Sequence, residues 1–176
     1  MNVMPPVALP AAPIARASAI IAAAHQLLAA LERGQRIDSA ALRTAMEVGF
    51  EASDVTGVWD WKTAYEACEC ATVLFLRKYG PALFRKADTS AARLTALSKI
   101  TGLLPTHTRR SEESQALQQF STPVPLGLAA IAAAAITPRD IVLEPSAGTG
   151  LLAILAEISG DRKSTRLNSS HLDLSR

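Results

Sequence analysis

The chain has 176 residues, a length that suits one domain or a domain with a small extension. Hydrophobic residues make up 49% of it and aromatic residues 5%; much of the apolar content is alanine, which predicts a mainly helical protein with thin helix interfaces. The whole net charge of +2 lies in the last sixteen residues, so the main body is neutral and the pI of 8.7 is no argument for a nucleic-acid surface.

The cysteines and the apolar segments argue against a disulfide, a metal centre and a membrane anchor. Cys68 and Cys70 are two residues apart, so on a helix they point to different faces, and no second Cys or His pair has metal-ligand spacing. The first thirty residues lack a basic start, and the apolar segment 124–136 is too short to span a bilayer. These features predict reduced thiols in a cytoplasmic protein with no metal and no membrane partner.

The N-terminal third is predicted to contain a leader and two helices. Residues 1–13 include four prolines and are expected to form a flexible leader. A helix is expected over 14–33, followed by a glycine that suits the position after a helix. A shorter helix, capped by Asp38 or Ser39, is expected to run to about Val48. The predicted buried stripe of the first helix is Ile14, Ala17, Ile21, Ala24, Leu28 and Leu31.

The third predicted helix, over 54–79, has the most regular apolar stripe, and Gly80-Pro81 is expected to end it. Its aromatic residues could stack on nucleic-acid bases, but their spacing favours core packing, with Trp59 the most exposed of them. The predicted stripe is Val58, Trp61, Tyr65, Cys68, Thr72, Phe75 and Tyr79.

A fourth helix is expected from Asp88 or Thr89 to about Leu103. It completes a predicted helical domain over 14–104, and the polar residues 105–113 are expected to form a linker. The predicted inner side of this helix is Leu94, Leu97, Thr101 and Leu104.

After the linker, residues 114–160 are predicted to begin an α/β domain. A helix over about 123–136, a turn at 137–140 and a strand at 140–144 are followed by a helix from near residue 150. The strand ends in an acidic residue before a tight Gly-x-Gly turn, a pattern typical of a cofactor loop. One strand alone cannot make a sheet, so its apolar side chains are expected to lack neighbours.

Three kinds of cofactor loop share this pattern. A P-loop requires a lysine that meets the terminal phosphates, and none follows Gly150, which argues against ATP hydrolysis there. Residues 148–153 do satisfy the dinucleotide pattern Gly-x-Gly-x-x-Ala, so a nicotinamide cofactor is a real alternative. Glu144 favours the third kind, a loop that binds S-adenosylmethionine. A carboxylate repels a pyrophosphate and attracts the cationic ammonium and sulfonium groups of S-adenosylmethionine. The upstream FSTP segment at 120–123 has no role in a dinucleotide site.

The pair QFSTP and LEPSAGTG resembles the opening of amino-methylating DNA methyltransferases, and in particular bacterial strawberry-notch-like methylase–helicase proteins, in which a methyltransferase domain precedes a helicase. The resemblance covers residues 118–158. It implies the truncated start of a Rossmann-like class I methyltransferase domain, S-adenosylmethionine as cofactor, adenine N6 as target and DNA as a partner of the parent protein. The implied cofactor site is Phe120, Ser121, Thr122, Pro123, Glu144, Pro145, Ser146, Ala147, Gly148, Thr149 and Gly150.

The family's catalytic motif, Asn/Asp-Pro-Pro-aromatic, is absent from this sequence. In the family its polar residue accepts the amino hydrogens of a flipped-out adenine, so we expect no methylation by this chain. Two alternatives stay open: a fragment of a nicotinamide-dependent oxidoreductase, and a non-enzymatic helical binding module. Thr122 and Pro123 also suit the N-cap and first position of a helix.

The end of the chain differs in composition from the rest. Residues 161–171, DRKSTRLNSSH, match codon for codon the translation of a common short-read sequencing adapter. Residues 161–176 are therefore expected to be an artefactual tail, and the natural protein is expected to continue past Gly160.

Overall fold

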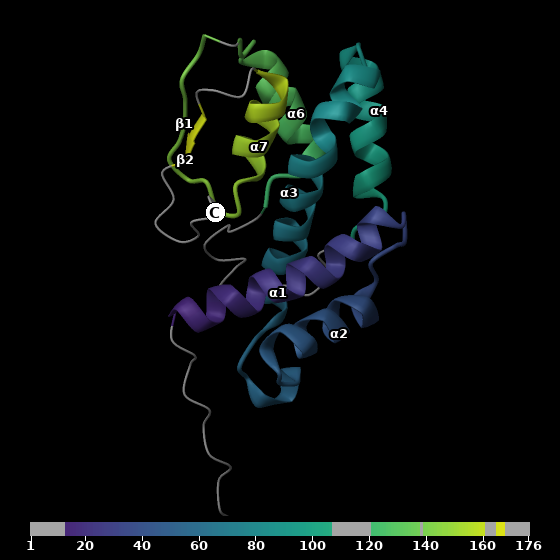
Figure 1. The fold of residues 1–176 in the computed structure, drawn as a ribbon, viewed down its shortest axis with the longest axis vertical. Coiled ribbons are helices and arrows are strands. Elements are labelled where there is room, and N and C mark those ends of the chain that lie inside the picture. The colour runs from purple at the N-terminus through teal and green to yellow at the C-terminus, as the bar shows by residue number, and fades with distance from the viewer. Residues whose placement is uncertain (1–12, 107–120, 138, 161–164, 168–176) are drawn as a thin grey trace, which may run out of the picture.

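The computed structural model describes residues 13–106, 121–137, 139–160 and 165–167. Within these ranges the chain is mainly helical, as predicted, with one small sheet (Figure 1). The elements in chain order are α1 (Pro13–Glu32), α2 (Ser39–Phe50), the 3-10 helix η1 (Asp54–Thr56), α3 (Trp61–Lys86), α4 (Ser90–Thr101), α6 (Val124–Ala133), β1 (Val142–Glu144), α7 (Leu151–Ser159) and β2 (Thr165–Leu167).

The longest helix, α3, connects the two halves of the fold. Helices α1 and α2 cross its N-terminal half, whereas α4, α6 and α7 gather around its C-terminal half (Figure 1). Buried side chains form two clusters accordingly. The first core comes mainly from α1, α2 and the start of α3, and includes Ile20, Ala24, Leu27, Leu31, Leu42, Met46, Ala64 and Cys68. The second core includes Val73, Leu76, Phe84, Leu97, Ile100, Val124, Leu128, Ile131, Leu151, Ile154 and Leu155.

Helix α1 has nearly its predicted bounds, but its predicted buried stripe is only partly right: Ala24 and Leu31 are buried as predicted, whereas Ala17, Ile21 and Leu28 are half-buried. Ile14 is 83% exposed, because it lies at the open end of the helix. Since α1 packs against both α2 and α3, its buried face is wider than one stripe and is centred on different positions. The buried residues are Ile20, Ala23, Ala24, Leu27 and Leu31. Gly34 follows the helix with a φ of 66°, as the sequence predicts.

Small residues allow α1 and α2 to approach closely. A Cβ on Gly49 would lie 2.5 Å from the backbone oxygen of Ala19 and 3.0 Å from the Cβ of Ala23. The cap of α2 is also as predicted, because the Asp38 carboxylate accepts a hydrogen bond from the Ala41 backbone N–H at 2.8 Å. Local signals therefore place α2, and small side chains set its distance from α1.

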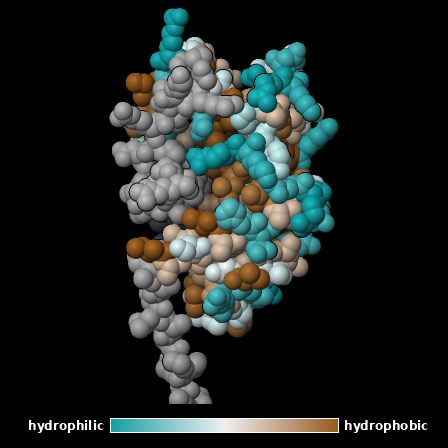
Figure 2. All heavy atoms as spheres, viewed as in Figure 1, coloured by the Kyte–Doolittle hydropathy of each residue, from teal (hydrophilic) through white to brown (hydrophobic). Residues whose placement is uncertain are grey.

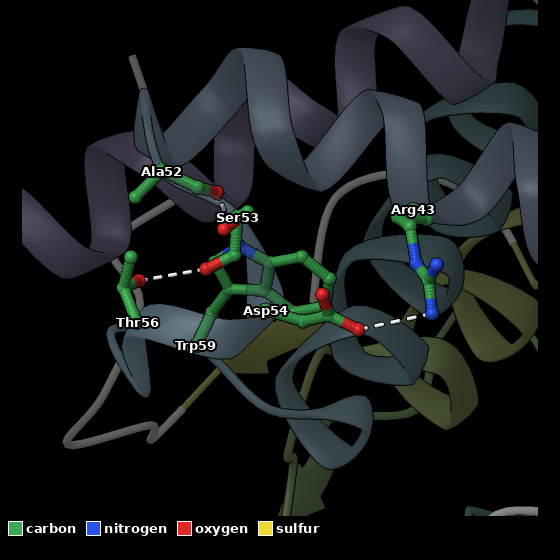
Figure 3. A network of polar contacts seen from close by, with 6 residues as sticks. All are labelled: Arg43, Ala52, Ser53, Asp54, Thr56 and Trp59. Atoms are coloured by element: carbon green, nitrogen blue, oxygen red, sulfur yellow. Dashed lines mark hydrogen bonds and ion pairs between the residues drawn. The ribbon is translucent and has the colours of Figure 1, made fainter.

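Trp59 is a core residue, and the prediction that it is the most exposed aromatic of its group is wrong. It is only 2% exposed, and its indole N–H donates to the backbone oxygen of Ala52 at 2.7 Å (Figure 3). The neighbouring turn is held by an ion pair between Arg43 and Asp54 at 3.0 Å (Figure 3). Trp59 lies before α3 rather than on it, so helical spacing could not place its side chain.

Helix α3 begins later and ends later than predicted. It starts at Trp61, and it continues through Gly80 and Pro81, the predicted stop. A proline removes one backbone N–H from a helix, but Phe84 beyond it is 5% exposed in the second core. Gly80 lies so close to Ile158 that a Cβ would come within 2.9 Å of that side chain. Burial of the segment after the proline therefore outweighs the local stop signal.

Helix α4 starts where predicted, with the Thr89 hydroxyl accepting from the Ala92 backbone N–H at 3.1 Å. Its inner side is partly different from the prediction. Leu97 is buried as expected, but Leu94 is 44% exposed and Ile100 is buried instead. The helix packs chiefly against α6, and this contact selects the buried positions.

The second core joins residues from both sides of the predicted linker at 105–113, of which the structure describes 105 and 106. Helix α7 packs against α3 and α6, and a Cβ on Gly127 of α6 would lie 2.7 Å from Leu155 of α7. The segment that carries the predicted cofactor loop is thus packed on the helices before the linker. The division into a helical domain and a following domain stays a prediction.

The turn before β1 is confirmed, and β1 is shorter than the predicted strand. The Asp140 backbone N–H donates to the Thr137 backbone oxygen at 3.1 Å, and the Asp140 carboxylate accepts from the Thr137 N–H at 2.7 Å. Ile141 is 75% and Leu143 66% exposed, as expected for apolar side chains without neighbours, whereas Val142 is half-buried and packs against the second core, contrary to that expectation.

In Figure 2, polar residues predominate on the visible face over α4, whereas apolar residues also reach the surface elsewhere.

The sheet has two parallel strands. Val142 lies opposite Thr165 and Glu144 opposite Leu167, and α7 connects the strands, which gives the order strand, helix, strand. Strand β2 falls within 161–176, the segment that resembles an adapter translation. Outside that segment, β1 is the one strand of the described residues.

Candidate functional site

The glycine loop, defined here as residues 144–150, leads from β1 into α7 as predicted. Gly148 and Gly150 have φ angles of 53° and 90°, in the left-handed region that favours glycine. The Gly150 N–H donates to the Ala147 backbone oxygen at 2.7 Å, which closes the turn directly before the helix. A Cβ at Gly150 would meet nothing within 4 Å, so the backbone conformation, rather than crowding, calls for glycine there.

Glu144 bends back over the glycine loop. Its carboxylate accepts a hydrogen bond from the Ser146 backbone N–H at 3.0 Å, and the side chain is half-buried. Pro145 and Ser146 are exposed, and Ala147 is half-buried. The loop therefore carries a fixed negative charge, and the Glu144 carboxylate already takes up one of its backbone N–H groups.

The other predicted segment lies directly before α6. Ser121, Thr122 and Pro123 are exposed, whereas Phe120 lies outside the described residues. Pro123 occupies the N-cap position of α6 without a side-chain hydrogen bond, so the prediction that Thr122 could cap this helix is wrong. The hydroxyl of Thr122 is not used for capping.

Glu69 of α3 brings the two predicted segments together. The Ser121 hydroxyl donates to the Glu69 carboxylate at 2.9 Å, although the two residues are 52 positions apart. Thr149 of the glycine loop is 7% exposed, and its hydroxyl also acts on the Glu69 carboxyl, lowering its pKa. The Thr149 hydroxyl nevertheless has no partner of full hydrogen-bond geometry among the described residues.

The surroundings of Glu69 favour its protonated form. Burial raises the pKa of Glu69 above its ordinary value, and the nearby Glu66 raises it further. The Ser121 hydroxyl, which donates to the carboxylate, and the nearby Thr149 hydroxyl lower the pKa of Glu69, but burial is the larger effect. The group that connects the two segments is thus a carboxyl held in an unfavourable place for a charge.

Glu69 is not part of the predicted apolar stripe of its helix, and the sequence analysis gives it no role. A signal was nevertheless present. One turn away on either side, at i−4 and i+4, Glu69 has Tyr65 and Val73 rather than a basic residue. A carboxyl inside such an apolar stretch needs hydrogen-bond donors from elsewhere in the fold.

The cysteines beside Glu69 take no part in this chemistry. Cys68 and Cys70 are both free, as predicted, and both are buried, although the sequence predicts burial for Cys68 alone; burial raises the pKa of each thiol to about 12. Thiols of such high pKa are poor nucleophiles at neutral pH. Within the described part of the chain, no group of three or more His, Cys, Asp and Glu residues could hold a metal ion.

Two open cavities lie near the C-terminal ends of α3 and α7, away from the glycine loop at the N-terminus of α7. The larger, of about 450 Å³, is lined by charged residues of both signs, including Arg77, Arg85, Arg93 and Glu157. The smaller shares Arg77, Arg85 and Glu157 with it. Neither cavity is lined by a residue of the glycine loop.

One described helix meets the length and composition of a membrane span. It is the stretch Ile14–Glu32 of α1. A single helix of this kind is weak evidence of a membrane span, because core helices can have the same length and composition. Part of α1 is buried in the first core, where it packs against α2 and α3.

No protein-family model, curated protein or solved structure matches the chain. What supports a function is therefore the site itself: the glycine loop, the carboxylate of Glu144, and the contact that attaches Ser121 to α3.

Proposed function

We propose that the chain is the N-terminal part of an S-adenosylmethionine-dependent DNA methyltransferase that acts on adenine N6, in a parent protein of the kind that also carries a helicase. One observation carries the proposal. The two segments that resemble the methyltransferase motifs, around Ser121 and around Thr149, are held next to the same carboxyl, that of Glu69. Their proximity in space is what a shared cofactor site requires.

The residues present fit a cofactor with a cationic centre. Glu144 supplies a carboxylate at the mouth of the glycine loop, where it would attract the ammonium and sulfonium groups. Gly148 and Gly150 leave the loop backbone bare, and the buried Thr149 hydroxyl lacks a full partner. Ser121 and Thr122 would contact the methionine end of the cofactor from the other side. When bound, S-adenosylmethionine supplies an electrophilic methyl group.

The same features weigh against a dinucleotide. A pyrophosphate at the start of α7 would need free backbone N–H groups and no nearby negative charge. Here the Glu144 carboxylate lies over the loop and already accepts from the Ser146 N–H. The nicotinamide-dependent oxidoreductase is therefore the weaker candidate.

A Rossmann-like fold is part of the proposal, and the order β1, α7 supports it, because such folds begin with a strand, a glycine turn and a helix. The parallel pairing of β1 with β2 carries no weight here, since β2 lies in the segment that resembles an adapter. In the proposed parent protein, further strands would cover Ile141 and Leu143.

This chain would bind and orient the cofactor without transferring its methyl group. The sequence contains no Asn/Asp-Pro-Pro-aromatic motif to hold a flipped adenine amino group. We expect no labelled methyl transfer to adenine-containing DNA.

An NMR titration of the isotope-labelled chain tests the proposal. S-adenosylmethionine should shift the amide signals of residues 144–151 and 121–122, and NAD⁺ at the same concentration should leave them in place. Shifts with NAD⁺ alone would replace the proposal by the oxidoreductase. No shifts with either compound would overturn the cofactor loop and leave a helical binding module.

A further inference from the structure

Glu69 occupies a place that only distant residues can make favourable for a carboxyl. On α3 it lies between buried Cys68 and Cys70 and is itself half-buried. The Ser121 hydroxyl, from the segment before α6, donates to its Oε2 at 2.9 Å. A polar group removed from water at this cost is stabilised by such donors, and in turn it holds them in place.

The second partner comes from the glycine loop. Thr149 is 93% buried, being 7% exposed, yet its hydroxyl has no hydrogen-bond partner of full geometry. This hydroxyl lowers the pKa of Glu69. The Glu69 carboxyl is therefore associated with both segments. The Ser121 segment is attached to it by a hydrogen bond, and Thr149 of the glycine loop lies close enough to lower its pKa.

We propose that Glu69 is a positioning residue of the cofactor site, which holds the Ser121 segment and the glycine loop at a fixed separation through the hydroxyls of Ser121 and Thr149. Helix α3 thereby forms one wall of the site. The part that concerns S-adenosylmethionine rests on the proposed function, whereas the attachment of the two segments to α3 does not depend on it.

Glu66 provides an internal comparison. It lies on the same helix, one turn before Glu69, and burial raises its pKa as well. The charged groups that act on Glu66 are Lys62, Arg16 and Asp60, and none belongs to the Ser121 segment or to the glycine loop. Two half-buried acids of one helix thus differ in the feature that matters, which is contact with the site.

Hydrogen–deuterium exchange of the full chain tests the attachment, with Glu69→Ala, Glu69→Gln and the matched control Glu66→Ala. In Glu69→Ala the amides at 122–128 and 147–152 should exchange roughly tenfold faster or more, the loss expected for hydrogen bonds to a carboxylate. Glu69→Gln keeps an acceptor oxygen and should stay close to wild type. The control should leave both regions unchanged. Equal exchange in Glu69→Ala and Glu66→Ala would overturn the proposal.

If Glu69→Ala does not fold, Ser121→Ala and Thr149→Val test the two attachments separately. Each should accelerate exchange in its own segment, and exchange unchanged in both variants would overturn the proposal equally.

Titration of the same variants with S-adenosylmethionine separates the two claims. Loss of the ligand-induced shifts in Glu69→Ala, with their retention in Glu69→Gln and Glu66→Ala, supports a positioning role. If exchange is faster in Glu69→Ala but the wild type does not respond to S-adenosylmethionine, the attachment of the two segments to α3 stands. The positioning of a cofactor and the proposed function are then both overturned. Wild-type binding that survives in Glu69→Ala would overturn the positioning role alone.

Discussion

The first core and the region of the glycine loop are stabilised in different ways. In the first core, α1, α2 and α3 bury Leu27, Leu42 and Met46 almost completely. Around β1, by contrast, Ile141 and Leu143 are largely exposed, and a half-buried carboxyl attaches the neighbouring Ser121 segment to α3. The helices therefore carry the stability of the described chain, while the candidate site depends on a few polar contacts.

The largest expected effect is the loss of a side chain from the first core. Leu27→Ala removes a residue that is 2% exposed and should lower the free energy of unfolding by about 2–5 kcal/mol. Ile141→Ala, at a position that is 75% exposed, should change it by no more than about 0.5 kcal/mol. Urea unfolding followed by circular dichroism measures both. Similar losses in the two variants would abolish the contrast between the regions.

A somewhat smaller effect is expected where α1 and α2 approach most closely. Gly49→Val would place a Cβ 2.5 Å from the backbone oxygen of Ala19, so the helices would have to move apart, at a cost of about 1–3 kcal/mol. Thr44→Val, on an exposed position of the same helix, serves as the control and should be nearly neutral. If thermal unfolding shows Gly49→Val to be as stable as the control, close packing of small residues does not hold these helices.

The smallest effect concerns the pH dependence of stability. Because burial raises the pKa of Glu69 above its ordinary value of 4.5, the native state binds its proton more tightly than the unfolded state. The stability that Glu69 contributes is therefore complete below pH 4.5 and is lost as the pH rises through the raised pKa. Glu69→Gln cannot ionise, so its free energy of unfolding relative to wild type should increase from pH 4 towards neutrality.

Urea titrations at several pH values measure this difference. The pKa of Glu66 is also raised by burial, but Glu66 is present in both proteins, so its contribution to the pH dependence largely cancels. A difference that stays constant with pH, or that falls as the pH rises, would contradict the account of Glu69.

Features set by local chemistry could be predicted from the sequence. Asp38 caps α2, Gly34 ends α1, and Thr137 and Asp140 make a turn, because each of these depends on residues within a few positions along the chain. The turn from Glu144 into α7 belongs to the same group, since an acidic strand end and two glycines specify it locally.

Features set by packing could not be predicted in this way. Pro81 does not end α3, because Phe84 is buried beyond it, and Trp59 is buried in the first core, where Ala52 accepts its indole N–H. The role of Glu69 depends on Ser121, which is 52 residues away, so no spacing within α3 could reveal it. Periodicity identified the helices, whereas the contacts between them selected the buried faces.

The most direct test of the central claim is the affinity of the chain for S-adenosylmethionine in wild type and in Glu144→Gln, with Glu157→Gln at the far end of α7 as the control. If Glu144 attracts the cationic cofactor, Glu144→Gln should weaken binding about tenfold, as for the loss of a charge-assisted contact, and the control should match wild type. Unchanged or tighter binding in Glu144→Gln would contradict a glycine loop shaped for a positively charged sulfur compound.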